Sequence, residues 1–343
     1  MRTLPVEQAV GLRLACDVTG ITAHQVRAIL TKGMRIEPGH VAMLRDAGHD
    51  VVYVRDDDEP DSAAELVSED EAALELARAL SGTGLGIQPG GSGRAFLIAR
   101  ADGLVRIRKD TCARLNDSEV ALVMTLPQHS VGRAGRLVAA VDLVPLQVPA
   151  TGLAELVAGL AQDGPAIEVR PFALRRVGLV ITGSEVYEGR VADLVAPVVR
   201  ATVARYGGEV GDVQVVPDDE ARIAAVILGL VTTHDIVVVT GGMSIDPTDR
   251  TPSAIRRVAD RVVKHGLPVL PTAMSMVAYR GAVPILGISS GIIHYPDGNV
   301  LERLLPLAMC GEPITRAELV AAGVGGLGAA FVADVERRMG PQA

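Results

Sequence analysis

The C-terminal half of the chain alternates short apolar segments with helical segments, and this alternation constrains the fold most strongly. Strands are predicted at residues 177–181, 211–216, 236–239 and 283–288. Helices are predicted at residues 193–206, 219–230, 251–263 and 300–309. Short, strongly apolar strands separated by helices are typical of a parallel sheet that is buried on both faces. The pattern therefore predicts an α/β domain over residues 171–330, with a mostly parallel sheet between two layers of helices.

The loops that follow these strands are rich in small and acidic residues. They comprise residues 182–190, 217–219, 240–250 and 289–295. Because ligands of open α/β sheets bind outside the carboxyl ends of the strands, we expect these loops to carry the function. Asp218 and Asp249 follow different strands, and we expect both carboxylates to face one cleft.

The most specific segment is the stretch 234–255. Its apolar run ends in a Thr-Gly-Gly turn at residues 240–242, and a loop that contains Asp249 follows. A helix then begins at Thr251, the expected N-cap, with Pro252 at its first position. Glycines and a helix N-terminus favour a phosphate group, and carboxylates can hold the Mg²⁺ that neutralises it. The stretch predicts a site for a phosphorylated small molecule with a divalent cation.

Each of these features also has a purely structural explanation. Gly241 and Gly242 can serve only to make a tight turn between strand and helix. Asp219 can serve only as the N-cap of the helix that follows it. The functional interpretation therefore depends on the convergence of several loops at one edge of the sheet.

Composition excludes several classes of function. The 343 residues include 41 acidic and 33 basic side chains, and the net charge of −8 argues against non-specific nucleic-acid binding. Cys16, Cys112 and Cys310 are far apart and are expected to be reduced thiols. There is no signal-peptide pattern, no long apolar run, and no GxSxG or HExxH motif. We therefore expect a cytoplasmic protein that has no membrane or nucleic-acid partner, no zinc site and no serine nucleophile.

The N-terminal half is predicted to contain two smaller domains. Residues 1–60 form a small α/β unit with a short helix at 22–31, and a charged connector at 56–61 ends it. Residues 61–170 form a helix, expected over 62–82, followed by a β-rich domain, and the glycine-rich run 84–93 is expected to be flexible. Residues 331–343 are expected to be a tail.

The C-terminal motifs resemble the molybdopterin-binding domain of molybdenum-cofactor biosynthesis proteins, over roughly residues 175–330. The glycine-rich signature of that family is similar to residues 240–244 and 249–252, TGGMS and DRTP. Its Pro-Asp before a helix is similar to residues 217–218, and its opening strand and turn to residues 180–185. Asp193 fits an acidic residue at a helix start. Residues 269–281 and the tail from residue 311 look like a subgroup called simply molybdopterin-binding proteins.

Two enzymes of this family share the domain. One adenylylates the terminal phosphate of molybdopterin, and the other removes that AMP and inserts molybdate. The resemblance implies that Asp218 and Asp249 are catalytic residues associated with Mg²⁺. Phosphoryl transfer depends mainly on positioning and charge neutralisation, which suits such a site. The residues expected to bind the cofactor are Thr182, Gly183, Ser184, Asp193, Thr240, Gly241, Gly242, Ser244, Ser289 and Ser290.

Three functions stay open at this point. The first is binding of molybdopterin, or of its adenylylated or molybdenum-loaded form, with Mg²⁺-dependent adenylyl or molybdate transfer that involves ATP or AMP. The second is a non-catalytic carrier or sensor that docks a molybdoenzyme or another biosynthetic protein. The third is a relative that processes pyridine nucleotides, like the competence-damage-type domain. A homo-oligomer is expected, because neighbouring subunits often complete the clefts of related domains.

Overall fold

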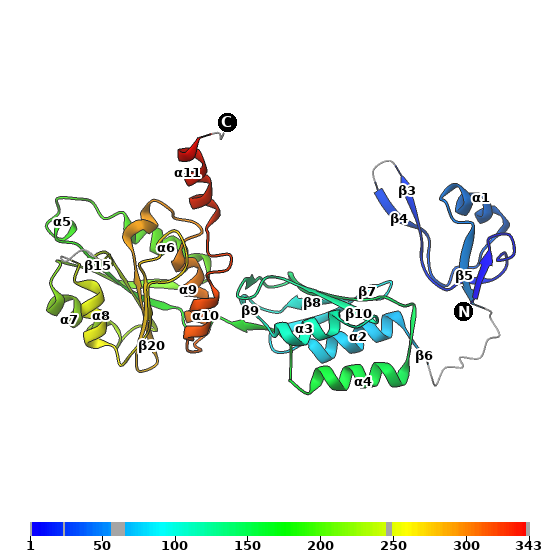
Figure 1. Ribbon diagram of the computed structural model, residues 1–343, viewed down its shortest axis with the longest axis horizontal. Helices are drawn as coiled ribbons and strands as arrows, with labels where there is room; N and C mark the ends of the chain where they lie inside the picture. The colour runs from blue at the N-terminus through cyan, green and yellow to red at the C-terminus, as the bar shows by residue number, and fades with distance from the viewer. Residues whose placement is uncertain (1, 23–24, 56–65, 245–248, 341–343) are drawn as a thin grey trace. The chain divides into compact units, whose positions relative to one another are not determined.

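The computed structural model describes residues 2–22, 25–55, 66–244 and 249–340 (Figure 1). The charged connector at 56–61 and the first part of the predicted helix at 62–82 lie outside the described residues. The chain divides into two compact units. The first comprises residues 1–100, 106–126 and 134–168, and the second comprises 101–105, 127–133 and 169–343.

The first unit begins with a small α/β part. Strands β1 (Arg2–Pro5), β5 (Val51–Arg55) and β2 (Arg13–Leu14) form an antiparallel sheet, accompanied by helix α1 (Pro38–Asp46). The short helix predicted at 22–31 is wrong, because β3 (Val18–Thr22) and β4 (Gln25–Leu30) pair as an antiparallel hairpin. The β-branched residues Val26 and Ile29 favour this extended conformation.

The rest of the first unit is a second, larger α/β part. Its four-stranded antiparallel sheet has the order β10 (Ala121–Thr125), β12 (Leu137–Leu143), β8 (Arg94–Ala99) and β7 (Leu85–Gly91). Its helices are α2 (Glu69–Leu80), α3 (Lys109–Asn116) and α4 (Ala150–Ala161). The other strands of this part are β6 (Leu66–Ser68) and β13 (Gln147–Pro149), which pair with each other. The helix predicted at 62–82 is therefore wrong for residues 66–68, because they form β6 and Ser68 caps a helix that begins at Glu69. Strands β11 (Val131–Gly132), β9 (Gly103–Ile107) and β14 (Ile167–Pro171) form a separate three-stranded sheet, which is not confined to the first unit.

Two local features of this part follow from its residues. Ser68 caps α2 by accepting a hydrogen bond from the backbone N–H of Glu71, whose side chain reaches back to the cap. The glycine-rich run at 84–93 was expected to be flexible, and this expectation is wrong for strand β7. Residues 85–91 of the run pair with β8, so the sheet satisfies the backbone groups that face this neighbour.

The second unit contains a six-stranded sheet of the predicted type. Its order is β16 (Glu209–Val216), β15 (Arg176–Thr182), β17 (Ile236–Thr240), β20 (Val283–Ile288), β19 (Met276–Arg280) and β18 (Arg261–His265). The first four strands are parallel, and β19 and β18 continue the sheet in antiparallel fashion. The sheet is flanked by α5 (Ser184–Tyr187), α6 (Val195–Arg205), α7 (Glu220–Leu230), α8 (Thr251–Val258), α9 (Val300–Met309) and α10 (Arg316–Ala321).

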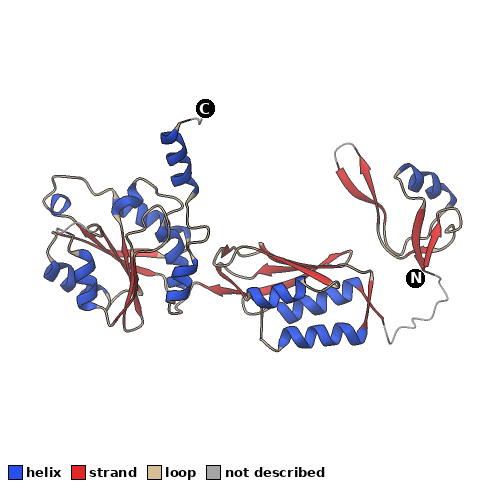
Figure 2. Cartoon of the chain, in the orientation of Figure 1, coloured by secondary structure: helices blue, strands red, loops and turns tan. Residues whose placement is uncertain are grey.

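Helices cover both faces of this sheet (Figure 2). Side chains of α7 and α8 form one core with alternate residues of the strands, among them Val180 and Val239. Side chains of α6, α9 and α10 form the other core with the intervening residues, among them Leu179 and Val238. This alternation is what a strand buried on both faces requires. The predicted three-layer, mostly parallel α/β architecture is confirmed.

Two predictions for the end of this unit need correction. The helix predicted at 251–263 ends at Val258, because Arg261–His265 form strand β18 and pair with β19. The segment expected as a tail begins within helix α11 (Ala329–Met339). Among the described residues, no helix is long and apolar enough to span a membrane.

Candidate functional site

Loops that follow β15, β16, β17 and β20 enclose a cleft of about 370 Å³ at the carboxyl edge of the sheet. We call it the acidic cleft. The sequence-predicted residues that line it are Thr182, Gly183, Asp193, Asp218, Thr240, Gly241, Gly242, Asp249 and Ser290. Its remaining lining residues are Ile181, Glu185, Val186, Val191, Ala192, Leu194, Val195 and Ile293.

The floor of the acidic cleft is the turn at Gly241 and Gly242. Gly241 has a φ of +91°, and a Cβ there would stand 2.2 Å from the carbonyl oxygen of Thr182. Gly242 has a φ of +50°, and a Cβ there would stand 3.5 Å from Oδ1 of Asp249. Glycine adopts a positive φ without steric cost, and without a Cβ it keeps the space in front of the carboxylate open. The glycine pair therefore both makes the turn and shapes the cleft.

Buried threonines hold the two loops on either side of this turn. The hydroxyl of Thr182 donates to the carbonyl oxygen of Thr240 over 3.2 Å and lies 3.0 Å from the hydroxyl of Thr251. All three threonines are at most 5% exposed. A buried hydroxyl needs such partners, so these bonds fix the end of β15 against the start of α8. The prediction that Thr251 is the N-cap of this helix is wrong, because Arg250 occupies the cap position and Thr251 is the first residue of α8. The Thr251 hydroxyl lies against Thr182 instead of capping the helix.

Asp218 reaches the cleft from the end of β16. Its Oδ2 accepts hydrogen bonds from the backbone N–H of Ser184 over 2.9 Å and from the Ser184 hydroxyl over 3.2 Å. These bonds tie the loop after β16 to the loop after β15. Oδ1 of Asp218 has no hydrogen-bond partner among the residues that the structure describes. One carboxylate oxygen is thus available to a ligand.

Asp249 has the same arrangement on the loop before α8. Its Oδ2 accepts a hydrogen bond of 2.7 Å from the backbone N–H of Ser244. Its Oδ1 faces the Gly242 turn and, within the described part of the chain, accepts no hydrogen bond. The two aspartates follow different strands and line one cleft, as the sequence predicts.

The acidic cleft carries four carboxylates, from Glu185, Asp193, Asp218 and Asp249. No lysine, arginine or histidine is among its described lining residues. Asp193 also has a structural role, since it accepts hydrogen bonds from the backbone N–H groups of Val195 and Ala196 at the start of α6. An anionic ligand would be repelled here unless a cation accompanies it.

This donor set fits a magnesium ion. Mg²⁺ prefers oxygen ligands and is typically held by one or two carboxylates together with phosphate and water. Asp218 and Asp249 each offer one oxygen without a protein partner. No group of three or more histidine, cysteine or acidic side chains that could hold a metal occurs among the described residues. A site of two carboxylates therefore needs the oxygens of a ligand to complete it.

The predicted serines differ in their placement. Ser290 lines the cleft in the 3-10 turn η1 (Ser290–Ile293). Ser184, Ser244 and Ser289 are not among the described lining residues. Ser184 and Ser244 bond the two aspartates from behind, whereas Ser289 caps η1 by accepting from the N–H of Gly291. They support the lining residues instead of facing the cleft.

Sequence reasoning missed the apolar wall of the cleft. Val186, Val191, Leu194 and Ile293 are among the lining residues, and Leu194 is 56% exposed. Val186 lies in the loop 182–190 that was expected to carry function, and Val191 and Leu194 lie just beyond it. The signal that could have found them is this run of aliphatic side chains between a strand and a helix. Such a wall suits the flat, apolar face of a ring system.

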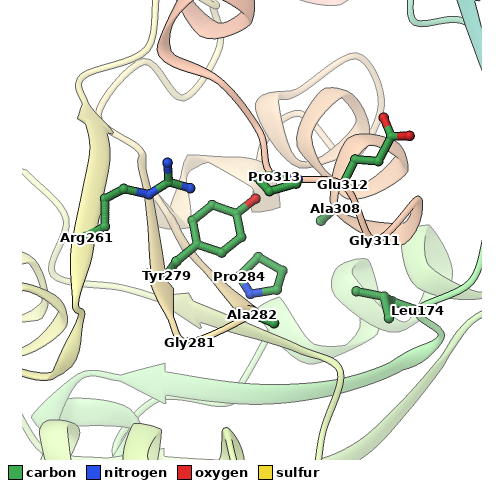
Figure 3. A pocket seen from close by; sticks show the side chains of 10 residues that line it. All are labelled: Leu174, Arg261, Tyr279, Gly281, Ala282, Pro284, Ala308, Gly311, Glu312 and Pro313. Atoms are coloured by element: carbon green, nitrogen blue, oxygen red, sulfur yellow. The ribbon is translucent and has the colours of Figure 1, made fainter.

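A second cavity in this unit is much smaller, at about 90 Å³ (Figure 3). The guanidinium of Arg261 lies 5.0 Å from the centre of the Tyr279 ring, and the Tyr279 hydroxyl accepts a 2.8 Å bond from the N–H of Ile314. Burial raises the pKa of Tyr279. These contacts pack α10 against the edge strands, and the volume is too small for a cofactor.

The region around the acidic cleft matches a known protein family. Residues 178–301 match the family model described as "probable molybdopterin binding domain". Residues 3–56 match a domain of unknown function. The first match spans the ends of β15, β16, β17 and β20, and therefore every loop that lines the acidic cleft.

Curated relatives match a part of the chain. A molybdopterin molybdenumtransferase of Staphylococcus aureus strain Mu50 is 29% identical over 140 residues, which are 39% of this chain and 33% of the relative. The enzyme of that name from Staphylococcus epidermidis is 24% identical over 120 residues, 33% of this chain and 29% of the relative. The chain thus spans about a third of the length of the curated relatives it matches.

Solved structures are similar over a comparable length. The molybdopterin biosynthesis enzyme MoaB from Thermus thermophilus is 24% identical with a TM-score of 0.36, covering 41% of this chain and 99% of that one. The molybdopterin biosynthesis Mog protein from Mycobacterium ulcerans is 21% identical with a TM-score of 0.34, covering 39% and 97%. By the family match and the sequence relatives, this part of the chain is similar to the molybdopterin-binding domains of molybdenum-cofactor biosynthesis proteins.

Proposed function

We propose that the acidic cleft binds molybdopterin, or its adenylylated or molybdenum-loaded form, through a phosphate group and Mg²⁺. The observation that carries this proposal is the charge of the cleft. Four carboxylates line it without a described cationic side chain, and Asp218 and Asp249 each keep one oxygen without a partner among the described residues. A phosphorylated ligand therefore requires a divalent cation. The match to the molybdopterin-binding family supports a pterin as the organic part of the ligand.

Different lining residues bind the phosphate and the pterin ring in this proposal. The backbone at Gly241 and Gly242 receives the phosphate, since no side chain stands in front of it. Asp218 and Asp249 hold Mg²⁺, which would neutralise phosphate charge when bound. The aliphatic wall, with Val186 and Leu194, packs against the pterin, and Thr182 and Ser290 stand at its polar edge.

The chemistry that suits this arrangement is transfer or cleavage at the linkage between the phosphate and AMP. Positioning and charge neutralisation supply most of the catalysis of such reactions. Relatives named molybdopterin molybdenumtransferase support a transferase, although this chain spans only about a third of their length. Asp218 and Asp249 are the catalytic residues in this proposal, with ATP or AMP as the second ligand.

We also propose that a second copy of the chain covers the rim of the cleft. Tyr187, Val191 and Leu194 lie in or beside the loop that forms the apolar wall, and each is more than half exposed. Clustered exposed aliphatic and aromatic side chains favour a protein interface. Light scattering of the full chain tests this proposal. A dimer or trimer that dissociates in the variant Leu194→Asp is expected, and a monomeric wild type contradicts it.

Calorimetric titration of the full chain with molybdopterin in the presence of Mg²⁺ tests the proposed ligand. Asp249→Asn removes a charge and keeps an acceptor for the Ser244 N–H, so the loop stays closed. Affinity is expected to fall about tenfold or more. The matched control is Asp219→Asn, because Asp219 only caps α7 and asparagine caps equally well.

Equal affinity of Asp249→Asn and wild type would remove this carboxylate from the site. An assay for adenylylation and for molybdate insertion separates the remaining alternatives. Turnover supports the transferase, and tight binding of molybdopterin without turnover supports a carrier or sensor. A pyridine nucleotide, found by mass spectrometry in the purified protein in place of a pterin, would contradict the proposed ligand.

A further inference from the structure

A second cleft begins where the acidic cleft ends. Ile293, the last residue of η1, lines the acidic cleft, and the next residue, His294, lines a cleft of about 480 Å³. We call it the arginine cleft. Its lining residues are His294, Tyr295, Ala330, Asp334, Arg337 and Arg338. One wall is therefore the segment after η1, and the other is helix α11.

Tyr295 holds α11 in place. Its ring lies edge-on to that of Phe331 with 5.9 Å between the centres, and its hydroxyl donates a 2.8 Å hydrogen bond to Oδ2 of Asp334. Phe331 and Asp334 are three residues apart and lie on one face of the helix. These two contacts define the side of α11 that faces the cleft.

The guanidinium groups of Arg337 and Arg338 stand on the same side. Asp334 pairs with Arg337 over 3.4 Å and with Arg338 over 2.7 Å. The two arginine side chains are 77% and 76% exposed. One carboxylate therefore orients two cations, and the trio keeps a net positive charge.

The two arginines have many more N–H donors than Asp334 has acceptor oxygens, which distinguishes this cluster from an ordinary surface ion pair. Each guanidinium carries five N–H donors, whereas Asp334 has two oxygens, one of which already accepts from Tyr295. Most of the donors are thus free to bind something else. Paired guanidinium groups bind phosphate oxygens with two parallel hydrogen bonds each, and the cleft is large enough for a small molecule.

We propose that the arginine cleft is a metal-independent binding site for the phosphate groups of a small molecule. Arg337 and Arg338 bind the phosphate oxygens, Tyr295 positions the helix, and His294 closes the other wall. The inference does not depend on the proposed pterin ligand, because it concerns different residues and a different charge. Together with the proposed site in the acidic cleft, this would give the chain two phosphate sites, of which only one needs Mg²⁺.

Titration of the full chain with inorganic pyrophosphate in EDTA tests this inference. EDTA removes divalent cations, so the carboxylates of the acidic cleft repel the probe and only the arginine cleft can bind it. The double variant Arg337→Ala/Arg338→Ala is expected to lose about tenfold or more in affinity. Asp334→Asn is expected to bind the probe more tightly, since it removes the competing negative charge but keeps an acceptor for Tyr295.

The control variant is Arg256→Ala/Arg257→Ala, which removes another exposed, adjacent arginine pair, at the end of α8. It changes the net charge by the same amount and should bind pyrophosphate as the wild type does. Equal losses in the two double variants would show a general charge effect and overturn the proposal. A wild type that does not bind pyrophosphate at millimolar concentration in EDTA would overturn it as well.

Discussion

The acidic cleft and the arginine cleft adjoin along the chain but are built in opposite ways. The acidic cleft is assembled from backbone turns and short side chains that follow four strands of the sheet. The arginine cleft consists of long, exposed side chains on a helix that packs beyond the sheet. The first has a fixed shape and needs an added cation, whereas the second carries its own positive charge. The acidic cleft can therefore be recognised from a sequence motif, because its residues follow the strands of the sheet. The arginine cleft cannot, because it depends on how a later helix packs.

The largest effect is expected from adding a methyl group to the turn of the acidic cleft. In Gly241→Ala the new Cβ would stand 2.2 Å from the carbonyl oxygen of Thr182, on a backbone with φ of +91°. Conformational strain and overlap together are expected to lower the free energy of unfolding by about 3 kcal/mol. Chemical denaturation measures this change.

The matched control for this substitution is Gly229→Ala in helix α7. No atom lies within 4 Å of a Cβ at Gly229, so alanine should stabilise the helix by about 0.5–1 kcal/mol. If Gly241→Ala were as stable as the wild type, the turn would not have the fixed shape on which the comparison of the two clefts depends.

A smaller effect, of about a hundredfold in affinity, is expected from removal of the divalent cation. With EDTA in place of Mg²⁺, molybdopterin should bind the acidic cleft about 2.7 kcal/mol more weakly, since four carboxylates then face its phosphate. Parallel titrations with Mg²⁺ and with EDTA measure the difference. Pyrophosphate binding in the arginine cleft should persist under both conditions. If molybdopterin bound with the same affinity in EDTA as in Mg²⁺, the two clefts would not differ in their need for a cation.

The smallest effect is expected from Tyr295→Phe, which removes one hydroxyl from the arginine cleft. The Tyr295 hydrogen bond, followed by the two arginines, lowers the pKa of Asp334. A carboxyl group with a lowered pKa stabilises the fold when the pH is above its unfolded pKa of about 3.9. This stabilisation is lost as the pH falls through the lower pKa of the folded state. In the variant the pKa of Asp334 should rise, as carbon-detected NMR titration of its carboxyl group would show. An unchanged pKa would mean that the arginines alone set it.

Most of the α/β architecture could be predicted because its strands are short, apolar and buried on both faces. Residues 236–239 and 283–288 illustrate this, and strands β17 and β20 confirm them. Strand β18 was assigned to a helix, because Arg261–His265 mixes charged and apolar residues at an edge of the sheet. Tertiary pairing with β19 decides its conformation, and a single sequence does not record such pairing.

The candidate site could be predicted in part for the same reason. Asp218 and Asp249 were expected to meet because both follow parallel strands, and the structure places both in one cleft. The arginine cleft could not be predicted, since nothing in the sequence brings Arg337 close to Tyr295. The functional roles of the lining residues, the domain boundaries and the cytoplasmic location stay predictions.

Crystals of the full chain soaked with Mn²⁺ and pyrophosphate would test the central claim most directly. Mn²⁺ accepts the oxygen ligands that hold Mg²⁺ and is located by its anomalous scattering. We expect an anomalous peak in the acidic cleft within coordination distance of carboxylate oxygens of both Asp218 and Asp249, with a phosphate group between the metal and the Gly241–Gly242 turn. Pyrophosphate bound in that cleft with neither aspartate near a metal would contradict it.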